Sequence, residues 1–459
     1  METPCRECLR LRQEVADLTT QVELLRRALE QSQRAGKRQA APFSKGPPKE
    51  QPKTPGRKAG DDHGQHGHRP PPPPEQIDEC HEAPLPEACS HCGGAVAETD
   101  VVQQYQTEIP RRPLIRQFNI HRGQCQTCGE AVQGRHPLQT SDALGAAASQ
   151  IGPDAQAAVV YLNKHAGLSH GKVAHAFQTL FGIKLSRGAS AQIVLRAGQR
   201  LRPAYQKIQE RLKTAEIITP DETGWRVGGQ PAWLHAWVGE GVTCYHIDPQ
   251  RSANALERVL GRDWPGTLVH DGWSSYDRFE DACHQQCQAH VLRRAHDLEE
   301  AAAGRAKVFP RQVIDLFQES LRVRDQFVDE APDLDRREQA QEDFTARLLE
   351  LTRKPRVNAA HQRLAAHLRN HQAQWFLFLI DPAVPATNYL GEQAVRPAVV
   401  NRKVWGGNRT AAGAEAQAIT TSVLQTCKQQ AKEALTYISQ TLRGFVTSLF
   451  TPCLAATGR

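Results

Sequence analysis

The spacing of apolar residues changes several times along this chain of 459 residues, and each change predicts a different kind of element. Near the N-terminus, apolar residues recur at heptad positions among charged ones, which predicts a helix with one apolar seam over 1–33. Two interpretations stay open, a coiled coil that makes a homo-oligomer and a single amphipathic helix, because three heptads are only marginally stable alone. The seam consists of Leu11, Val15, Leu18, Val22, Leu25 and Leu29.

The periodicity then disappears and later returns as a helical pattern. Over 34–76 the chain is rich in Pro, Gly, Lys, Arg and His, so we expect a disordered linker that no core holds together. Over 141–214 an alanine-rich stretch has helical apolar spacing with breaks at 167–170 and 182–186. This pattern fits a helix-turn-helix that binds DNA, and it also fits a plain helical bundle.

From Ala215 onward the pattern becomes that of strands. A short apolar run precedes two alternating runs that flank Gly239-Glu240-Gly241, which predicts a β-hairpin. A short helix and a further strand follow, and helical patterns fill most of the remainder. This order predicts an α/β layered domain over 215–425 and a helical tail over 426–459. The expected strands are 217–220, 233–238, 242–247 and 266–270, and the expected short helix is 253–260.

Composition narrows the class of protein. The formal net charge of +7 favours a polyanionic partner such as DNA. No apolar run is long enough to cross a bilayer, and the N-terminus does not resemble a secretory signal. Twelve cysteines in a chain without such a signal suggest reduced thiols, some of them metal ligands. We therefore expect a cytoplasmic protein with no membrane partner.

Two C-x2-C pairs lie in the segment 77–140, and a glycine follows the second cysteine of each pair. A tight turn with such a glycine lets two thiolates approach one ion, so two turns can complete a tetrahedral zinc site. Such a closed site would be structural and would contribute folding free energy to a segment with little core. The alternative is four ordinary buried thiols. The expected ligands are Cys89, Cys92, Cys125 and Cys128, with Cys80 as a competitor.

Two aspartates follow predicted strands. Asp221 comes after the first strand of the sheet, and Asp271 comes after the strand 266–270. If these strands are neighbours, both carboxylates lie at one edge of the sheet, where their repulsion calls for Mg²⁺ or Mn²⁺. Glu392 lies in a predicted helix beside the sheet and is the third acid. Three hard oxygen donors that hold two ions suit in-line attack at a phosphodiester, although aspartates after strands also occur in ordinary turns.

Several ordered motifs resemble those of a known family. They are Asp221-Glu222-Thr223, Trp237-Val238, Asp271-Gly272-Trp273-Ser274-Ser275-Tyr276, Cys287-x2-His290 with the paired arginines Arg293-Arg294, and Asn388-x3-Glu392-x3-Arg396. Together they resemble the successive signatures of insertion sequence 66 (IS66) family DDE transposases. The resemblance extends over most of the chain, from the heptads and the Pro/Gly/His linker to the acids.

The resemblance implies an RNase H-like catalytic domain with a helical insertion over 296–374. It also implies that Asp221, Asp271 and Glu392 are catalytic acids that bind two Mg²⁺ or Mn²⁺ ions. The implied function is a DNA transposase that cleaves phosphodiesters and transfers strands at the ends of a mobile element. Its implied partners are the element's terminal repeats, the target DNA and accessory proteins of the same element.

Other functional residues and functions are kept as alternatives. Arg402, Lys403 and Arg409 lie close to Glu392 in the sequence and are candidate phosphate contacts. His290 either supports the active site or joins Cys283, His284 and Cys287 at a metal. Two further functions stay open, a catalytically silent zinc-dependent DNA-binding protein derived from a transposase and a nuclease of the same fold that never rejoins DNA.

Overall fold

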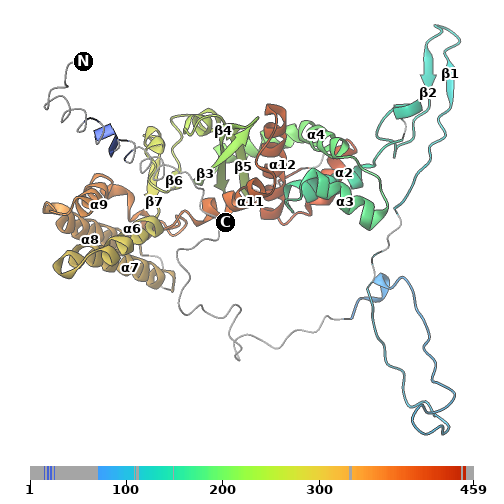
Figure 1. The fold of residues 1–459 in the computed structure, drawn as a ribbon, viewed down its shortest axis with the longest axis horizontal. Coiled ribbons are helices and arrows are strands. Elements are labelled where there is room, and N and C mark those ends of the chain that lie inside the picture. Colours follow the sequence, from blue (N-terminus) through green and yellow to red (C-terminus); the bar gives the residue numbers. More distant parts are fainter. Residues whose placement is uncertain are drawn as a thin grey trace, which may run out of the picture. The chain divides into compact units, whose positions relative to one another are not determined.

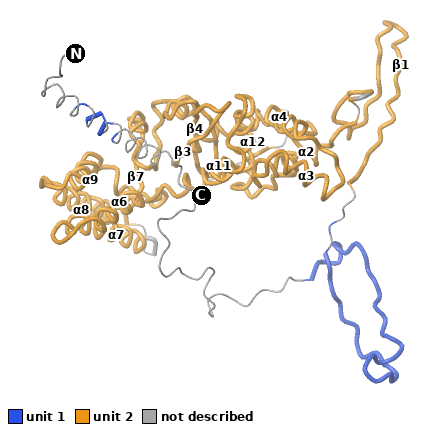
Figure 2. Tube along the Cα trace, viewed as in Figure 1, with its two compact units in different colours: residues 1–109 blue, residues 110–459 orange. Residues whose placement is uncertain are grey.

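The computed structural model describes six helical residues between positions 15 and 25, and the ranges 71–107, 113–147, 149–329, 333–445 and 448–450 together with residue 109. These residues form two compact units, 1–109 and 110–459, which are described separately (Figure 2). Most of the predicted linker 34–76 lies outside the described residues. No helix of the described part is both long and apolar enough to cross a membrane.

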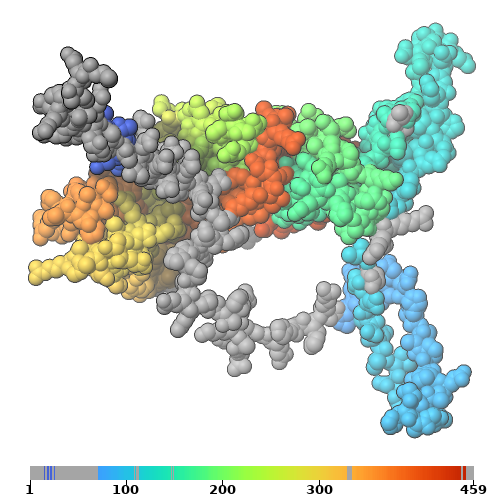
Figure 3. Space-filling view, in the orientation of Figure 1, coloured from blue at the N-terminus to red at the C-terminus, as the bar shows by residue number. Residues whose placement is uncertain are grey.

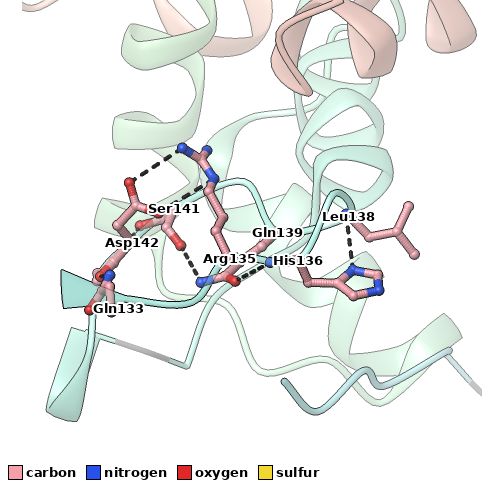
Figure 4. Close-up of polar contacts among 8 residues, drawn as sticks. Gln133, Arg135, His136, Leu138, Gln139, Ser141 and Asp142 are labelled. Carbon is pink, nitrogen blue, oxygen red and sulfur yellow. Dashed lines mark hydrogen bonds and ion pairs between the residues drawn. The ribbon is translucent and has the colours of Figure 1, made fainter. Parts of the chain in front are cut away.

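The first unit has little regular structure in its described part. It contains the short helix η1 (Pro74–Gln76) and a turn that the isolated bridge between Ala88 and Ala95 closes. The second unit begins with an antiparallel pair, β1 (Arg122–Gln124) and β2 (Ala131–Gln133). Side-chain contacts join this pair to the loop after it, where Asp142 accepts hydrogen bonds from Gln133 and Arg135 (Figure 4).

A five-stranded mixed sheet forms the centre of the second unit (Figure 1). Its strand order is β5-β4-β3-β6-β7, in which β3, β4 and β5 are antiparallel neighbours and β6 and β7 run parallel to β3. The predicted α/β class and the predicted hairpin are confirmed. The strands are β3 (Ile217–Val227), β4 (Gln230–Gly239), β5 (Val242–Asp248), β6 (Thr267–His270) and β7 (Cys283–Gln286).

Strand β3 is longer than the sequence predicts. The prediction took the short apolar run 217–220 as the whole strand. In the structure the pairing of β3 with β6 stops at Ile218, and the remainder of β3 pairs with β4 as far as Val227. Pro220 therefore lies where the strand has one partner, and Asp221 lies inside β3 instead of beyond its end.

Helices cover both faces of the sheet. Strand alternation turns Trp237 of β4 toward α4 (Arg187–Lys213) and α5 (Asn254–Leu260), and turns Leu234 and Ala236 toward α11 (Tyr389–Trp405). The expected short helix 253–260 is thus confirmed as α5. The face under α11 is the smaller core, and it lies beside the strand that carries Asp221.

Helix α12 (Ala411–Gln429) covers the edge strand β5. The Ser422 hydroxyl accepts a hydrogen bond from the Tyr245 amide at 2.8 Å, and the Thr426 hydroxyl bonds to the amide and the carbonyl of Thr243 at 3.2 Å. An exposed edge would offer these backbone groups to another chain. The hydroxyls satisfy them within the molecule, so this edge of the sheet is closed.

Two helical groups flank the sheet. On the β5 side lie α2 (Pro153–Lys164), α3 (His170–Phe181) and α4, with α13 (Ala434–Leu442) packed on α2 and α4. Beyond β7 a separate core lies among helices that extend past both ends of the predicted insertion 296–374 and form a lobe next to the sheet (Figure 3). These helices are α6 (Gln288–Ala301), α7 (Val308–Asp329), α8 (Leu334–Arg353), α9 (Ala359–Asn370) and α10 (Leu377–Ile380).

Candidate active site

Asp221 and Asp271 occupy matching positions in the register of two neighbouring parallel strands, the first inside β3 and the second directly after β6. Strand β3 pairs with β6 so that Ile217 lies opposite Thr267, and each aspartate lies four residues further along its own chain. Asp221 is held inside β3, and its Oδ1 accepts the Glu222 amide at 2.8 Å. Asp271 is the first residue after β6, and its Oδ1 accepts the Trp273 amide at 3.0 Å. The register therefore brings the two acids to the same part of the sheet.

Glu392 enters from the first turn of α11. The residue before that helix, Asn388, is buried, and its Nδ2 donates to the Pro220 carbonyl at 3.2 Å. The Glu392 amide in turn donates to the Asn388 carbonyl at 3.1 Å. A buried side chain thus fixes the start of α11 to the residue before Asp221.

Burial and the negative charges of other acids both act on Asp221. Burial, together with the negative charges of Glu222, Asp271 and Glu392, raises the pKa of Asp221 to about 7, against the lowering effect of the Glu222 amide. A divalent cation relieves this repulsion, and carboxylate oxygens are the donors that Mg²⁺ and Mn²⁺ prefer. The residues present therefore fit such ions. Within the described ranges, no three His, Cys, Asp or Glu side chains already lie close enough to hold one ion.

Glu222 belongs to a different network from the other acids. Its Oε1 binds the Arg251 guanidinium at 2.7 Å, and its Oε2 accepts the Tyr276 hydroxyl at 3.2 Å. Arg251 itself lies over the rings of Trp233 and Trp273, at 5.0 and 4.7 Å from their centroids. Both oxygens of Glu222 are thus engaged within the protein. The sequence showed Glu222 only as part of a motif, since Arg251 lies 29 residues away.

His290 lies beside Glu392. Its Nε2 is 3.8 Å from Glu392 Oε1, while its Nδ1 is buried and has no hydrogen-bond partner. The thiol of Cys287 lies at the start of α6, and burial raises its pKa. The His284 imidazole contacts His270 and the Phe279 carbonyl. These positions favour the interpretation that His290 supports the active site over the alternative that it joins these side chains at a metal.

The three candidate phosphate contacts differ in their surroundings. Arg402 is half-buried, and its guanidinium donates to the Thr223 hydroxyl and to the Gly224 carbonyl of β3. Lys403 and Arg409 are exposed. Arg402 therefore connects α11 to β3, whereas the side chains of the other two reach solvent.

The two C-x2-C turns have the same local geometry. In the first, the Gly93 amide donates to Cys89 O at 2.8 Å, and in the second the Gly129 amide donates to Cys125 O at 2.9 Å. Both glycines have a positive φ, near +70°, which favours glycine. Backbone hydrogen bonds lower the pKa of Cys89 and lower that of Cys125 to about 7, which favours the thiolate form that binds metal.

In the region 141–214, a turn joins the short helix α3 to the long helix α4. Ser169 caps α3 and Ser186 caps α4, and Gly182 ends α3 with a φ of 67°. The second half of α4 packs in the main core through Leu201, Ile208 and Leu212. The first part of α4 packs in the same core through Ile193, Val194 and Ala197, as a helix of a bundle does.

Comparisons with known proteins give a family match for more than half of the chain. A family model described as "Transposase IS66 family" matches residues 148–416, which is more than half of the chain and includes all three acids. An uncharacterized protein of Sinorhizobium fredii, y4qI, is 26% identical over 294 residues, which cover 57% of this chain and 53% of the relative. The matched part thus spans about half the length of that relative.

Proposed function

Since the chain belongs to the transposase IS66 family, we propose that it cleaves phosphodiesters at the ends of a mobile DNA element and transfers the strands in a Mg²⁺-dependent reaction. The observation that carries this proposal is the placement of Asp221 in β3, Asp271 directly after the neighbouring strand β6, and Glu392 in a helix whose start is bonded to β3. The mixed sheet, three antiparallel strands followed by two parallel ones, supports an RNase H-like fold.

The chemistry that two bound divalent ions supply is activation of the attacking water or 3′-hydroxyl and stabilisation of the leaving oxygen. Asp221, Asp271 and Glu392 would hold them. Asp221 offers a carboxylate from inside a paired strand, and Asp271 offers one from a loop just after β6. Because the three side chains come from different elements, the protein fixes their geometry through its fold and not through one flexible segment.

The test is Asp271→Asn in the full chain, with a duplex that carries the element end as substrate and Mg²⁺ as the metal. We expect loss of cleavage with DNA binding retained, because the amide keeps the shape of the carboxylate but loses its charge. Asp277→Asn, an exposed aspartate of the same loop, is the matched control and should cleave as the wild type does. Cleavage by Asp271→Asn would remove Asp271 from the mechanism, and a wild type that binds but never cleaves would favour the silent DNA-binding protein.

We also propose that Cys89, Cys92, Cys125 and Cys128 hold one structural zinc ion. The matching hydrogen bonds of the two turns and their lowered thiol pKa values support this proposal.

The N-terminal heptads support a proposal of self-association. Of the predicted seam, the described residues Val15, Leu18, Val22 and Leu25 are helical and at least half exposed. Apolar residues at such positions are buried when a second helix packs on them. We propose that the segment 1–33 makes a homo-oligomer. We also propose that the helices of 141–214 contact DNA and that Lys403 and Arg409 contact its phosphates. Sedimentation velocity with and without residues 1–34 tests the first of these.

A further inference from the structure

The loop that begins with Asp271 is held at both ends by a pair of histidines. The loop spans 271–279, between β6 and β7, and includes the short helix η3 (Ser274–Arg278). His270, the last residue of β6, contacts the start of this loop, and His284 of β7 contacts its end. Unlike Asp221, which lies inside a strand, Asp271 depends on this loop for its position.

Three hydrogen bonds connect the two ends of the loop. The Gly272 amide donates to His270 Nδ1 at 3.1 Å, His270 Nε2 lies 3.0 Å from His284 Nδ1, and His284 Nε2 lies 3.0 Å from the Phe279 carbonyl. The amide can only donate, so Nδ1 of His270 carries no proton and its Nε2 must donate. The carbonyl can only accept, so Nε2 of His284 donates and its Nδ1 accepts. Both ends of this chain of hydrogen bonds therefore require the same direction of donation, and each ring carries one proton and is neutral.

The surroundings of the pair make these bonds effective. His270 is 0% exposed, so water does not compete for its two nitrogens. Its ring also packs on His284 and on Tyr276, a residue in the middle of the loop, with centroids 5.2 Å apart in both cases. A pair of leucines would fill a similar volume but would bond neither end of the loop. The pair therefore adds orientation to what packing alone supplies.

The backbone carries this orientation to the carboxylate. Gly272 has a φ of +87°, and a side chain there would lie 2.5 Å from Gln286 Oε1, so this turn requires glycine. The residue after Gly272 is Trp273, and its amide donates to Asp271 Oδ1 at 3.0 Å. When His270 fixes the Gly272 amide, the next amide stays aimed at the carboxylate.

We propose that His270 and His284 are positioning residues, whose chain of hydrogen bonds fixes both ends of the 271–279 loop and thereby aims the Asp271 carboxylate toward Asp221. The effect on catalysis rests on the proposed function, whereas the effect on the loop does not. His284→Leu removes both bonds of the second ring, and His284→Gln can still accept through its oxygen and donate through its nitrogen. His361→Leu, which replaces a buried histidine of the helical lobe, is the matched control.

Hydrogen–deuterium exchange of the full chain, followed in peptides that cover 271–279, tests the loop without DNA or metal. We expect exchange to quicken about tenfold or more in His284→Leu, to remain near the wild-type rate in His284→Gln, and to be unchanged there in His361→Leu. Wild-type exchange in His284→Leu overturns the proposal. Equal acceleration in His284→Leu and His361→Leu also overturns it, because that result indicates general loosening.

Two further measurements separate this proposal from the proposed function. In the wild type, ¹⁵N NMR should show both rings protonated at Nε2 only, and a proton on Nδ1 of either ring overturns the hydrogen-bond direction. The Mn²⁺ concentration for half-maximal cleavage of the element-end duplex should rise roughly 10–100-fold in His284→Leu, as for other residues that orient metal ligands, and recover in His284→Gln. If the wild type does not cleave while the exchange pattern holds, the proposed reaction fails and the positioning role stands.

Discussion

Gly391 of α11 lies directly against Asp221 of β3. A β-carbon built at Gly391 would lie 2.9 Å from the β-carbon of Asp221, closer than side chains approach one another, and still closer to Asn388 Oδ1. The residue before Glu392 therefore has no side chain because the strand of the first acid occupies that space. This contact sets how near the third acid can come to the first.

The first prediction tests this contact with Gly391→Ala. A helix interior gains up to about 1 kcal/mol from alanine, but forced overpacking costs about 1–3 kcal/mol. We expect the unfolding free energy to fall and cleavage of the element-end duplex to slow at least about tenfold, because α11 must move away from β3. Urea unfolding and single-turnover cleavage measure these two effects.

Gly134→Ala is the control, since its β-carbon would meet the backbone oxygen and nitrogen of His121 at 3.7 and 4.0 Å, which are ordinary contacts. It should leave both quantities near their wild-type values. A Gly391→Ala protein as stable and as active as the wild type would show that α11 does not need this close approach.

A second prediction separates Arg402 from Lys403. Arg402 donates to Thr223 and Gly224 of β3, so Arg402→Ala should lower the unfolding free energy by about 1–3 kcal/mol. Lys403 is exposed, so Lys403→Ala should leave stability nearly unchanged. It should weaken DNA binding and lower the slope of log K against log salt by about 1. Chemical unfolding measures the first effect, and a salt titration of DNA affinity measures the second. A stability loss in Lys403→Ala with a smaller salt slope in Arg402→Ala would contradict this prediction.

Much of the sheet could be predicted because its signals are local. Alternating apolar residues around Gly239-Glu240-Gly241 indicated the hairpin of β4 and β5. Strand β7 could not be predicted, because its residues are mostly polar. Buried Gln285 donates to the Trp375 carbonyl and accepts the Phe378 amide, both about 90 residues away. The sequence of β7 alone contains neither partner, so only the folded insertion explains a buried glutamine there.

The acids of the site were found through ordered motifs, but their surroundings were not. Asp221 and Glu222 stand in one motif, of which the resemblance names only Asp221 as catalytic, and the fold gives the physical difference between them, because adjacent residues of a strand face opposite sides. Glu222 turns to Arg251 and Tyr276, and Asp221 turns to the start of α11. The role of Glu222 depends on contacts across the sheet that spacing does not reveal.

A third prediction concerns the C-x2-C turns. Cys92→Ser should lower the zinc content of the purified chain and its stability, because a hydroxyl is a poor replacement for a thiolate ligand. Cys80 is exposed and has no partner cysteine three residues further on, so Cys80→Ser should keep the wild-type zinc content. Atomic absorption measures the metal. Zinc loss in Cys80→Ser with zinc retained in Cys92→Ser would assign the ligand to Cys80.

Lys164 provides a prediction about pH, since it is a lysine buried at the C-terminal end of α2. It is 3% exposed, its Nζ donates to Gln417 Oε1 at 2.6 Å, and it lies 4.6 Å from the centroid of the Trp405 ring. Burial lowers its pKa from 10.5 to about 7. These contacts do not replace the hydration of an ammonium group, so the charged form is costly in the folded chain.

The sign of the pH dependence follows from the two pKa values. Between pH 7 and about 10 the unfolded chain keeps the proton of Lys164 while the folded chain has lost it, so the unfolding free energy rises with pH. The rise attributable to Lys164 is at most about 4 kcal/mol over this window, at about 1.4 kcal/mol per pH unit. Lys164→Met should remove that rise, whereas Lys172→Met, at an exposed lysine of α3, should retain it. Urea unfolding at pH 7 and pH 10 measures the difference. Parallel pH profiles for the wild type and Lys164→Met would show that Lys164 keeps its proton throughout and that its burial does not govern its charge.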